Sequence, residues 1–569
     1  MSDPAASAAL STLAAEYWEA YLVAHPVEAT IIGDRRFDDR LDDPSPQGVA
    51  ARIGELGAFA ARARALPADD LDEADRLTRE LLIEAADDER DRAAVGLEAW
   101  TVDPLSGPQV FFLSLPPLQP VASVVQGEAM VARVRAMAGW MDAHMANLRR
   151  SLGEGRVGVR EPIAKTIETL DALASRPLET WALLDPVREP HPDWRAGDLE
   201  DFRGDLLAAV REGVAPALDH YRRLLVEEIL PAARPGDRAG LSHLSGGAEA
   251  YRTLVRVHTT LDRQPEEVHE IGLRELARIA AETEELGRKV LGTPDRAATV
   301  ARLRDDPALR FSTREEVIRA AEAALARARA VMPAWFGILP QADCVVMPIA
   351  EHEERHATIA YYWQPAADGS RPGQYYINTY APETRPRFEA EVLAYHESIP
   401  GHHLAIAIAQ ELTGLPEFRR HLGVTAFDEG WGLYCERLAD EMGLYTSDLD
   451  RLGVLSFDAW RACRLVLDTG LHALGWSRDR AIAFMTENSP LALNNIVNEV
   501  DRYIVWPGQA LAYKTGQLEI LRLRAWAREA LGERFDIRAF HDTVLGQGAV
   551  PMSVLGDLIA RYVERATST

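Results

Sequence analysis

One stretch, residues 387–410 (RFEAEVLAYHESIPGHHLAIAIAQ), constrains the fold most, because polar residues interrupt an otherwise apolar helical pattern. The interrupting residues are His396, Glu397, His402 and His403. A glutamate beside a histidine is costly to bury without a partner. The alternative, a helix N-terminus with hydrogen-bonded core histidines, leaves that cost unexplained. We therefore expect this stretch to carry the chemistry.

The spacing of the histidines indicates a metal site. Neutral imidazole is the usual nitrogen ligand of zinc, and a catalytic zinc site has about three protein ligands and an open position. In an H-E-x-x-H helix the second histidine follows one turn after the first. Here Pro400 takes that position and would clash with the carbonyl of His396, which predicts a break at residues 398–399 with Pro400 opening the next segment. The bend decides whether His402, which we favour, or His403 shares a metal with His396.

A further helical pattern at residues 425–443 carries Glu429 and Glu436, seven residues apart and facing the same way. Glu429 follows His402 by 27 residues (429 − 402), which is enough for the chain to turn back. Glu429 is therefore a candidate third ligand. The alternative is an amphipathic helix with two solvated acids, since glutamate is usually exposed.

Four later residues are candidates for substrate contact. Tyr513 and His472 could donate hydrogen bonds to the oxyanion of a hydrolytic transition state, and Arg502 or Lys514 could bind a substrate carboxylate. Each of them is nearly as plausible as a structural residue, because such side chains often pack their stems and hydrogen-bond their tips.

β-branched and aromatic runs replace the helical pattern at residues 344–380. The runs at 357–363 and 374–380 (QYYINTY) predict a hairpin just before the motif helix. The letters HEERH at 352–356 match H-E-x-x-H, but charged variable residues and the strand-like run after them favour a false positive. On an extended chain the two histidines would lie about 13 Å apart.

The composition excludes several classes of partner. The formal charge of −26 argues against nucleic acid or an anionic membrane. The N-terminal stretch has no basic region, no apolar run is long enough to cross a membrane, and the three cysteines are scattered. These features predict a cytoplasmic globular protein.

Helical patterns fill the first 230 residues, which hold no cluster of potential ligands. The turn-rich segment 233–240 marks a boundary, which predicts an N-terminal helical lobe at 1–235 and a catalytic lobe at 236–569. We expect one compact, mainly α protein with a cleft between the lobes and a small β-hairpin or sheet beside the active-site helix.

The chain resembles the bacterial proteins of the domain-of-unknown-function 885 family in five segments: HESIPGHHL (396–404), DEGWGLYCERL (428–438), DTGLHALGW (468–476), RYIVWPGQALAYKTGQL (502–518) and HPVEATIIGDRRFDDRL (25–41). That family is similar in layout to zinc oligopeptidases of the thimet-oligopeptidase and angiotensin-converting-enzyme type. The resemblance implies a zincin-like two-lobed fold with one zinc ion per chain.

The resemblance also implies roles for the motif residues. It assigns the metal to His396, His402 and Glu429. It makes Glu397 the general base and Glu436 a residue that supports a ligand. The longer spacer with Pro400 departs from the pattern of those peptidases.

Two further roles follow from the same resemblance. Tyr513 would stabilise the oxyanion. The QYYINTY run would be a strand edge on which an extended peptide could lie, so Tyr376 and Asn378 are candidate substrate-binding residues.

These inferences predict a zinc-dependent hydrolase that cleaves an amide bond in short peptides, of carboxypeptidase or oligopeptidase type. Two alternatives remain open at this point: a metal-dependent hydrolase of a non-peptide amide or ester, and a non-catalytic helical binding protein with structural histidines.

Overall fold

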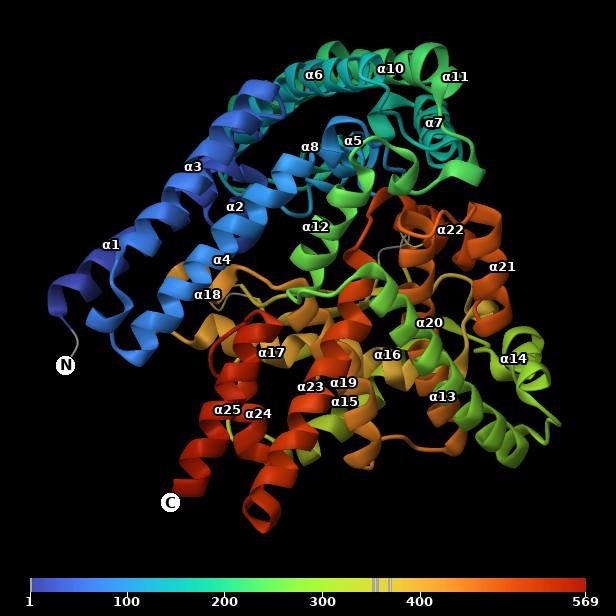
Figure 1. Ribbon diagram of the computed structural model, residues 1–569. Helices are drawn as coiled ribbons and strands as arrows, with labels where there is room; N and C mark the ends of the chain where they lie inside the picture. The colour runs from blue at the N-terminus through green and yellow to red at the C-terminus, as the bar shows by residue number, and fades with distance from the viewer. Residues whose placement is uncertain (1–2, 350–353, 355–357, 367–368, 370, 569) are drawn as a thin grey trace. The chain divides into compact units, whose positions relative to one another are not determined.

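The computed structural model describes residues 3–349, 354, 358–366, 369 and 371–568 of the 569-residue chain. The chain divides into two compact units, Met1–Ala239 and Gly240–Thr569. The sequence predicts this boundary four residues earlier, between residues 235 and 236. The protein is mainly helical, as predicted, with one small sheet (Figure 1). Among the described residues, no helix is both long and apolar enough to cross a bilayer.

Unit 1 is built from helices around an apolar core. Its helices are α1 (Pro4–Ala24), α2 (Pro26–Ile32), α3 (Pro46–Ala65), α4 (Glu73–Val95), α5 (Pro108–Phe111), α6 (Val124–Gly153), α7 (Arg160–Ala174), α8 (Asp185–Arg188), α9 (Ala196–Ala208), α10 (Ala215–Leu224) and α11 (Leu230–Ala232). Helix α3 packs along α4 (Figure 1). Ser123 and Gln126 form a reciprocal capping box that starts α6, and Met130, Met137 and Met141 of α6 enter the core.

One cation, Arg133 of α6, lies inside unit 1 at 1% exposure. Its Nε donates to the carbonyl of Arg40 at 2.8 Å, and Nη1 donates to Oε1 of Gln119 at 2.7 Å. Its Nη2 donates to the carbonyl of Phe37 at 2.7 Å and to Thr30 Oγ1 at 2.9 Å. The guanidinium is thus satisfied by neutral acceptors, which ties the α1–α3 region to α6.

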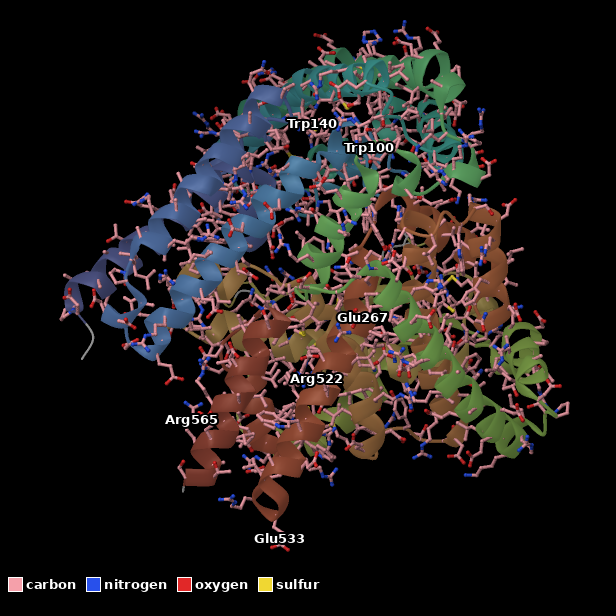
Figure 2. All side chains as sticks on the ribbon, in the orientation of Figure 1. Trp100, Trp140, Glu267, Arg522, Glu533 and Arg565 are labelled. Atoms are coloured by element: carbon pink, nitrogen blue, oxygen red, sulfur yellow. The ribbon has the colours of Figure 1, made fainter. Side chains whose placement is uncertain are left out.

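Unit 2 contains the predicted motif. Its helices are α12 (Gly247–Thr259), α13 (Pro265–Leu291), α14 (Arg296–Asp305), α15 (Arg314–Trp335), α16 (Ala390–Glu397), α17 (His402–Glu411), α18 (Glu417–His421), α19 (Thr425–Glu441), α20 (Asp448–His472), α21 (Arg478–Asn488), α22 (Leu493–Val505), α23 (Ala512–Leu531), α24 (Ile537–Leu545) and α25 (Met552–Ser568). Helix α20 is buried on all sides from residue 452 onward and packs along α13 (Figure 1). Charged side chains such as Arg522 and Glu533 lie at the surface (Figure 2).

Helices α19 and α23 cross at two glycines. A Cβ atom on Gly516 would lie 1.9 Å from the carbonyl oxygen of Ala426, and one on Gly430 would lie 2.5 Å from Cα of Gly516. Only glycine allows so close a contact. The crossing brings the N-terminal end of α23 next to α19.

The sheet has the order β1-β3-β2, with β1 at Cys344–Pro348, β2 at Ala360–Trp363 and β3 at Gly373–Ile377. Strand β3 pairs antiparallel with β2, which confirms the predicted hairpin, and parallel with β1. The expectation that QYYINTY forms an edge is therefore wrong, because its strand is the central one of the three. The sheet contacts α16 through β2, so it lies beside the motif helix.

Candidate metal centre

The motif helix breaks where the sequence predicts. Helix α16 ends at Glu397 and α17 begins at His402, with Pro400 in the connection rather than at the start of α17. A Cβ atom on Gly401 would lie 1.9 Å from the carbonyl oxygen of His396. Glycine therefore lets the connection fold back over the end of α16.

Helix α19 holds this connection in place. Trp431 Nε1 donates to the carbonyl of Pro400 at 2.9 Å, and the Cys435 thiol donates to the same oxygen at 3.2 Å. A Cβ atom on Gly432 would lie 2.8 Å from the ring of His396. The small residue lets the helix pack directly against that imidazole.

Three potential ligand atoms meet at this junction, one each from His396, His402 and Glu429, all within 4.8 Å of one another. Nε2 of His396 and Nε2 of His402 each lie 3.6 Å from Oε2 of Glu429. The two imidazole rings are perpendicular neighbours with centroids 4.6 Å apart.

These distances fit a bound cation better than direct hydrogen bonds. Nitrogen and oxygen atoms that share a hydrogen bond are about 2.7–3.2 Å apart. A tetrahedral zinc with bonds of about 2.0–2.1 Å separates its ligand atoms by about 3.4 Å. The observed 3.6 Å matches the second spacing.

Glu436 contacts the ring nitrogen of His396 that does not face Glu429. Its Oε1 lies 2.8 Å from Nδ1 of His396, and its side chain is 1% exposed. When the ring is neutral, as a metal ligand must be, an Nδ1 proton held by this carboxylate leaves the Nε2 lone pair facing Glu429. Burial lowers the pKa of His396, but the carboxylates of Glu429 and Glu436 outweigh it and raise the pKa to about 9.

His403 points away from the other two histidines. Its Nδ1 lies 2.8 Å from the hydroxyl of Tyr362, and its Nε2 lies 3.0 Å from the carbonyl of Ala342. Burial lowers the pKa of His403 to about 4, so it stays neutral between these partners. Of the two candidates left open by the sequence, only His402 joins His396.

Glu397 is half-buried at the last residue of α16, next to His396. Its carboxylate acts on Tyr375 of β3, where burial first and the charge of Glu397 second raise the pKa of the phenol. The general-base candidate thus belongs to the ligand helix, and its charge reaches β3.

Tyr513 of α23 is brought to the site by the crossing of α19 and α23. Burial first, and the carboxylate of Glu429 second, raise the pKa of its phenol. The guanidinium of Arg464 lies 4.2 Å from the centre of its ring. The phenol therefore stands beside a potential ligand and remains protonated at neutral pH.

His472 forms hydrogen bonds with the backbone away from the candidate metal centre. The backbone N–H of Leu241 donates to its Nδ1 at 3.2 Å, and its Nε2 lies 2.9 Å from the carbonyl of Tyr503. It is fully buried. Both ring nitrogens serve the backbone, and the structure does not bring His472 to the three ligand atoms.

Lys514 lies inside an ion network. Its ammonium bonds to Asp458 Oδ1 and to Gln517 Oε1, the latter at 2.7 Å, and pairs with Glu275 at 3.1 Å. Burial raises the pKa of Asp458, but Lys514 and Arg437 outweigh it and hold that pKa well below its usual range. Lys514 is thus committed to partners within the protein.

Arg502 lies in α22 beside Tyr513, to which it is electrostatically coupled. Its Nη2 donates to Gln509 Oε1 at 3.0 Å, and its guanidinium faces the ring of Trp506 at 5.5 Å. Of the two basic residues proposed for a substrate carboxylate, Arg502 is the one near the site.

The two strand candidates make internal contacts. The Asn378 amide donates to the carbonyls of Glu354 at 2.7 Å and Thr358 at 3.1 Å. The Tyr376 hydroxyl donates to Gln374 Oε1 at 3.2 Å. Apart from Glu354, the HEERH segment lies outside the described residues.

Sequence reasoning missed Arg461 and Arg464 of α20, which lie next to Tyr513 and are 5% and 2% exposed. A signal was present, since two arginines three residues apart stand in the apolar run FDAWRACRLVL. Buried arginine is rare unless it has partners.

Solved structures of other proteins share the fold of this chain. A search of curated proteins found no match. A solved structure described as a "putative lipoprotein from Colwellia psychrerythraea" is similar with a TM-score of 0.92 and 26% identity, covering 98% of this chain and 99% of that one. A "putative lipoprotein of unknown function from Shewanella oneidensis" has a TM-score of 0.74 and 17% identity, covering 97% and 99%. Residues 26–559 match the family described as "Bacterial protein of unknown function (DUF885)", and the chain belongs to that family.

Proposed function

We propose that this protein is a zinc-dependent hydrolase that cleaves an amide bond in short peptides. The observation that carries the proposal is the meeting of His396, His402 and Glu429 at the spacing of metal ligands. Two imidazoles and one carboxylate are a donor set typical of catalytic zinc, which keeps a further position open.

The surroundings of the donor set also fit a catalytic ion. His402 and Glu429 are 15% and 20% exposed, so the site is not sealed. Glu436 gives His396 the supporting carboxylate that metal-binding histidines commonly have. The order of ligands along the chain resembles that in zincin-like oligopeptidases.

Zinc held there would supply a Lewis acid that activates water and polarises the scissile carbonyl. Glu397, beside His396, accepts the proton of the attacking water and delivers it to the leaving amine. Tyr513 keeps its proton at neutral pH and donates a hydrogen bond to the developing oxyanion. Glu436 orients His396 throughout.

The test is Glu397→Gln in the zinc-loaded protein, assayed against a library of short peptides. We expect kcat/KM to fall about 10²–10⁴-fold while zinc stays bound, because only the proton acceptor is removed. Glu411→Gln is the matched control, since Glu411 is the last residue of α17 and accepts hydrogen bonds from the backbone N–H groups of Gln341 and Ala342. It should keep full activity.

Two results would count against the proposal. One is a zinc-loaded wild-type protein that cleaves no peptide of the library. The other is peptide cleavage that survives Glu397→Gln unchanged.

A further inference from the structure

Three arginines gather beside Tyr513. Arg461 and Arg464 lie three residues apart on α20, and Arg502 lies on α22. The guanidinium of Arg464 faces the ring of Tyr513 at 4.2 Å, and charge interactions couple Arg461 and Arg502 to the same phenol. Since Tyr513 stands next to Glu429, the cluster adjoins the candidate metal centre.

These arginines present buried N–H groups that the described part of the chain leaves without a hydrogen-bond acceptor. The atoms are Nε and Nη1 of Arg461, Nη1 of Arg464 and Nε of Arg502. An unsatisfied buried donor costs about 1–3 kcal/mol, and more when it is charged. Several such donors in one place indicate a missing partner.

The carboxylates near the cluster are shared between its arginines and other groups. Glu499 pairs with Arg464 at 3.0 Å and with Arg502 at 3.8 Å, so one carboxylate serves two guanidiniums. The charge of Glu436 acts on Arg461, but its Oε1 is bonded to His396. Glu429 also acts on Arg461, but its Oε2 and the Oε1 of Glu436 face the histidines of the candidate metal centre.

The guanidinium of Arg461 is fixed although it lacks polar partners at Nε and Nη1. It lies 4.1 Å from the ring centre of Trp460 and 4.4 Å from that of Phe457. These rings hold its plane without using its N–H groups. An arginine arranged in this way is ready to bind an anion.

We propose that Arg461 and Arg464, with Arg502 beside them, form a subsite that binds a carboxylate of the substrate next to the metal centre. A planar guanidinium fork matches a carboxylate through two parallel hydrogen bonds. The inference rests on the proposed function, because it gives the hydrolase its substrate class: peptides with a carboxylate close to the cleaved bond.

The carboxylate has two possible sources, the C-terminus of a peptide or an acidic side chain. Three probes separate them: N-acetyl-trialanine as the free acid, the same peptide as its C-terminal amide, and N-acetyl-Ala-Ala-Glu amide. Binding is measured by calorimetry on full-length, zinc-loaded Glu397→Gln, so that the readout does not depend on cleavage.

We expect at least one carboxylate probe to bind about tenfold or more tightly than the neutral amide, as charge-assisted hydrogen bonds imply. A tighter free acid identifies the C-terminus, and a tighter glutamyl amide identifies the side chain. Equal or undetectable binding of all three probes would overturn the subsite.

Substitutions at Arg461 then test whether this residue causes the preference for carboxylate probes. Arg461→Met should remove the preference for the carboxylate, and Arg461→Lys should retain part of it, because the charge stays and the fork is lost. Arg451→Met, on the same helix, is the matched control, since Arg451 pairs with Asp440 and Asp448. A preference that survives in folded Arg461→Met and Arg461→Lys would refute the assignment.

The two proposals fail separately. Carboxylate selectivity without peptide cleavage by the wild type would retain the subsite and remove the hydrolase. Peptide cleavage without carboxylate selectivity would support the hydrolase and refute the subsite.

Discussion

Arg133 in unit 1 and Arg461 in unit 2 are both buried, at 1% and 5% exposure, yet their surroundings differ. In Arg133, Nε donates to a carbonyl oxygen, Nη1 to an amide side-chain oxygen, and Nη2 to a carbonyl and a hydroxyl oxygen. Nε and Nη1 of Arg461 meet no acceptor among the described residues, and its neighbours are aromatic rings. The contrast separates a cation that stabilises the fold from one whose partner comes from outside the chain.

The largest effect on stability is expected at Arg133. Arg133→Met should lower the free energy of unfolding by about 3–5 kcal/mol, because it leaves several buried acceptors without a hydrogen-bond donor. Urea denaturation measures the loss. Arg135→Met is the control, since Arg135 lies on the same helix in an exposed pair with Asp205 and should change stability by about 0.5 kcal/mol or less. Equal effects of the two substitutions would contradict the structural role of Arg133.

Lys514 tests whether a paired buried cation in unit 2 behaves like Arg133. Lys514→Met should destabilise the protein by about 2–3 kcal/mol, because Asp458 loses one partner and keeps Arg437. The preference for carboxylate probes should not change. A loss of that preference with stability intact would mean that Lys514 contacts substrate after all.

The smallest effect on stability is expected at Arg461. Arg461→Met should change the free energy of unfolding by about 1 kcal/mol or less, since the methionine stem keeps the aromatic packing and an unpaired charge is removed. The same urea titration gives the value. A loss as large as that of Arg133→Met would remove the contrast on which the subsite rests.

Local sequence was enough to predict the break in the motif helix and the β2–β3 hairpin. Pro400 cannot continue a helix from α16, and two alternating runs around a turn pair with each other. Both features depend on neighbouring residues only.

Long-range contacts decided what the sequence left open. The choice between His402 and His403 depends on the path of residues 398–401, which Trp431 and Gly432 of α19 fix from outside the motif. The central position of β3 depends on its parallel partner β1, which no turn signal links to it.

Residue type alone also could not show which of the candidate side chains are already bonded within the protein. His472 and Lys514 have side chains suited to catalysis, but their partners Leu241 and Asp458 lie 231 and 56 residues away in sequence. Such partners are visible only in the folded chain.

The central claim is that His396, His402 and Glu429 hold zinc, and metal analysis by mass spectrometry tests it most directly. The samples are the wild type, His402→Ala, Glu429→Ala and, as the matched control, His403→Ala, each shown to be folded by circular dichroism. We predict about one zinc per chain in the wild type and in His403→Ala, and loss of zinc in the other two. A wild type that takes up no zinc on reconstitution, or Glu429→Ala and His402→Ala proteins that keep theirs, would contradict the account.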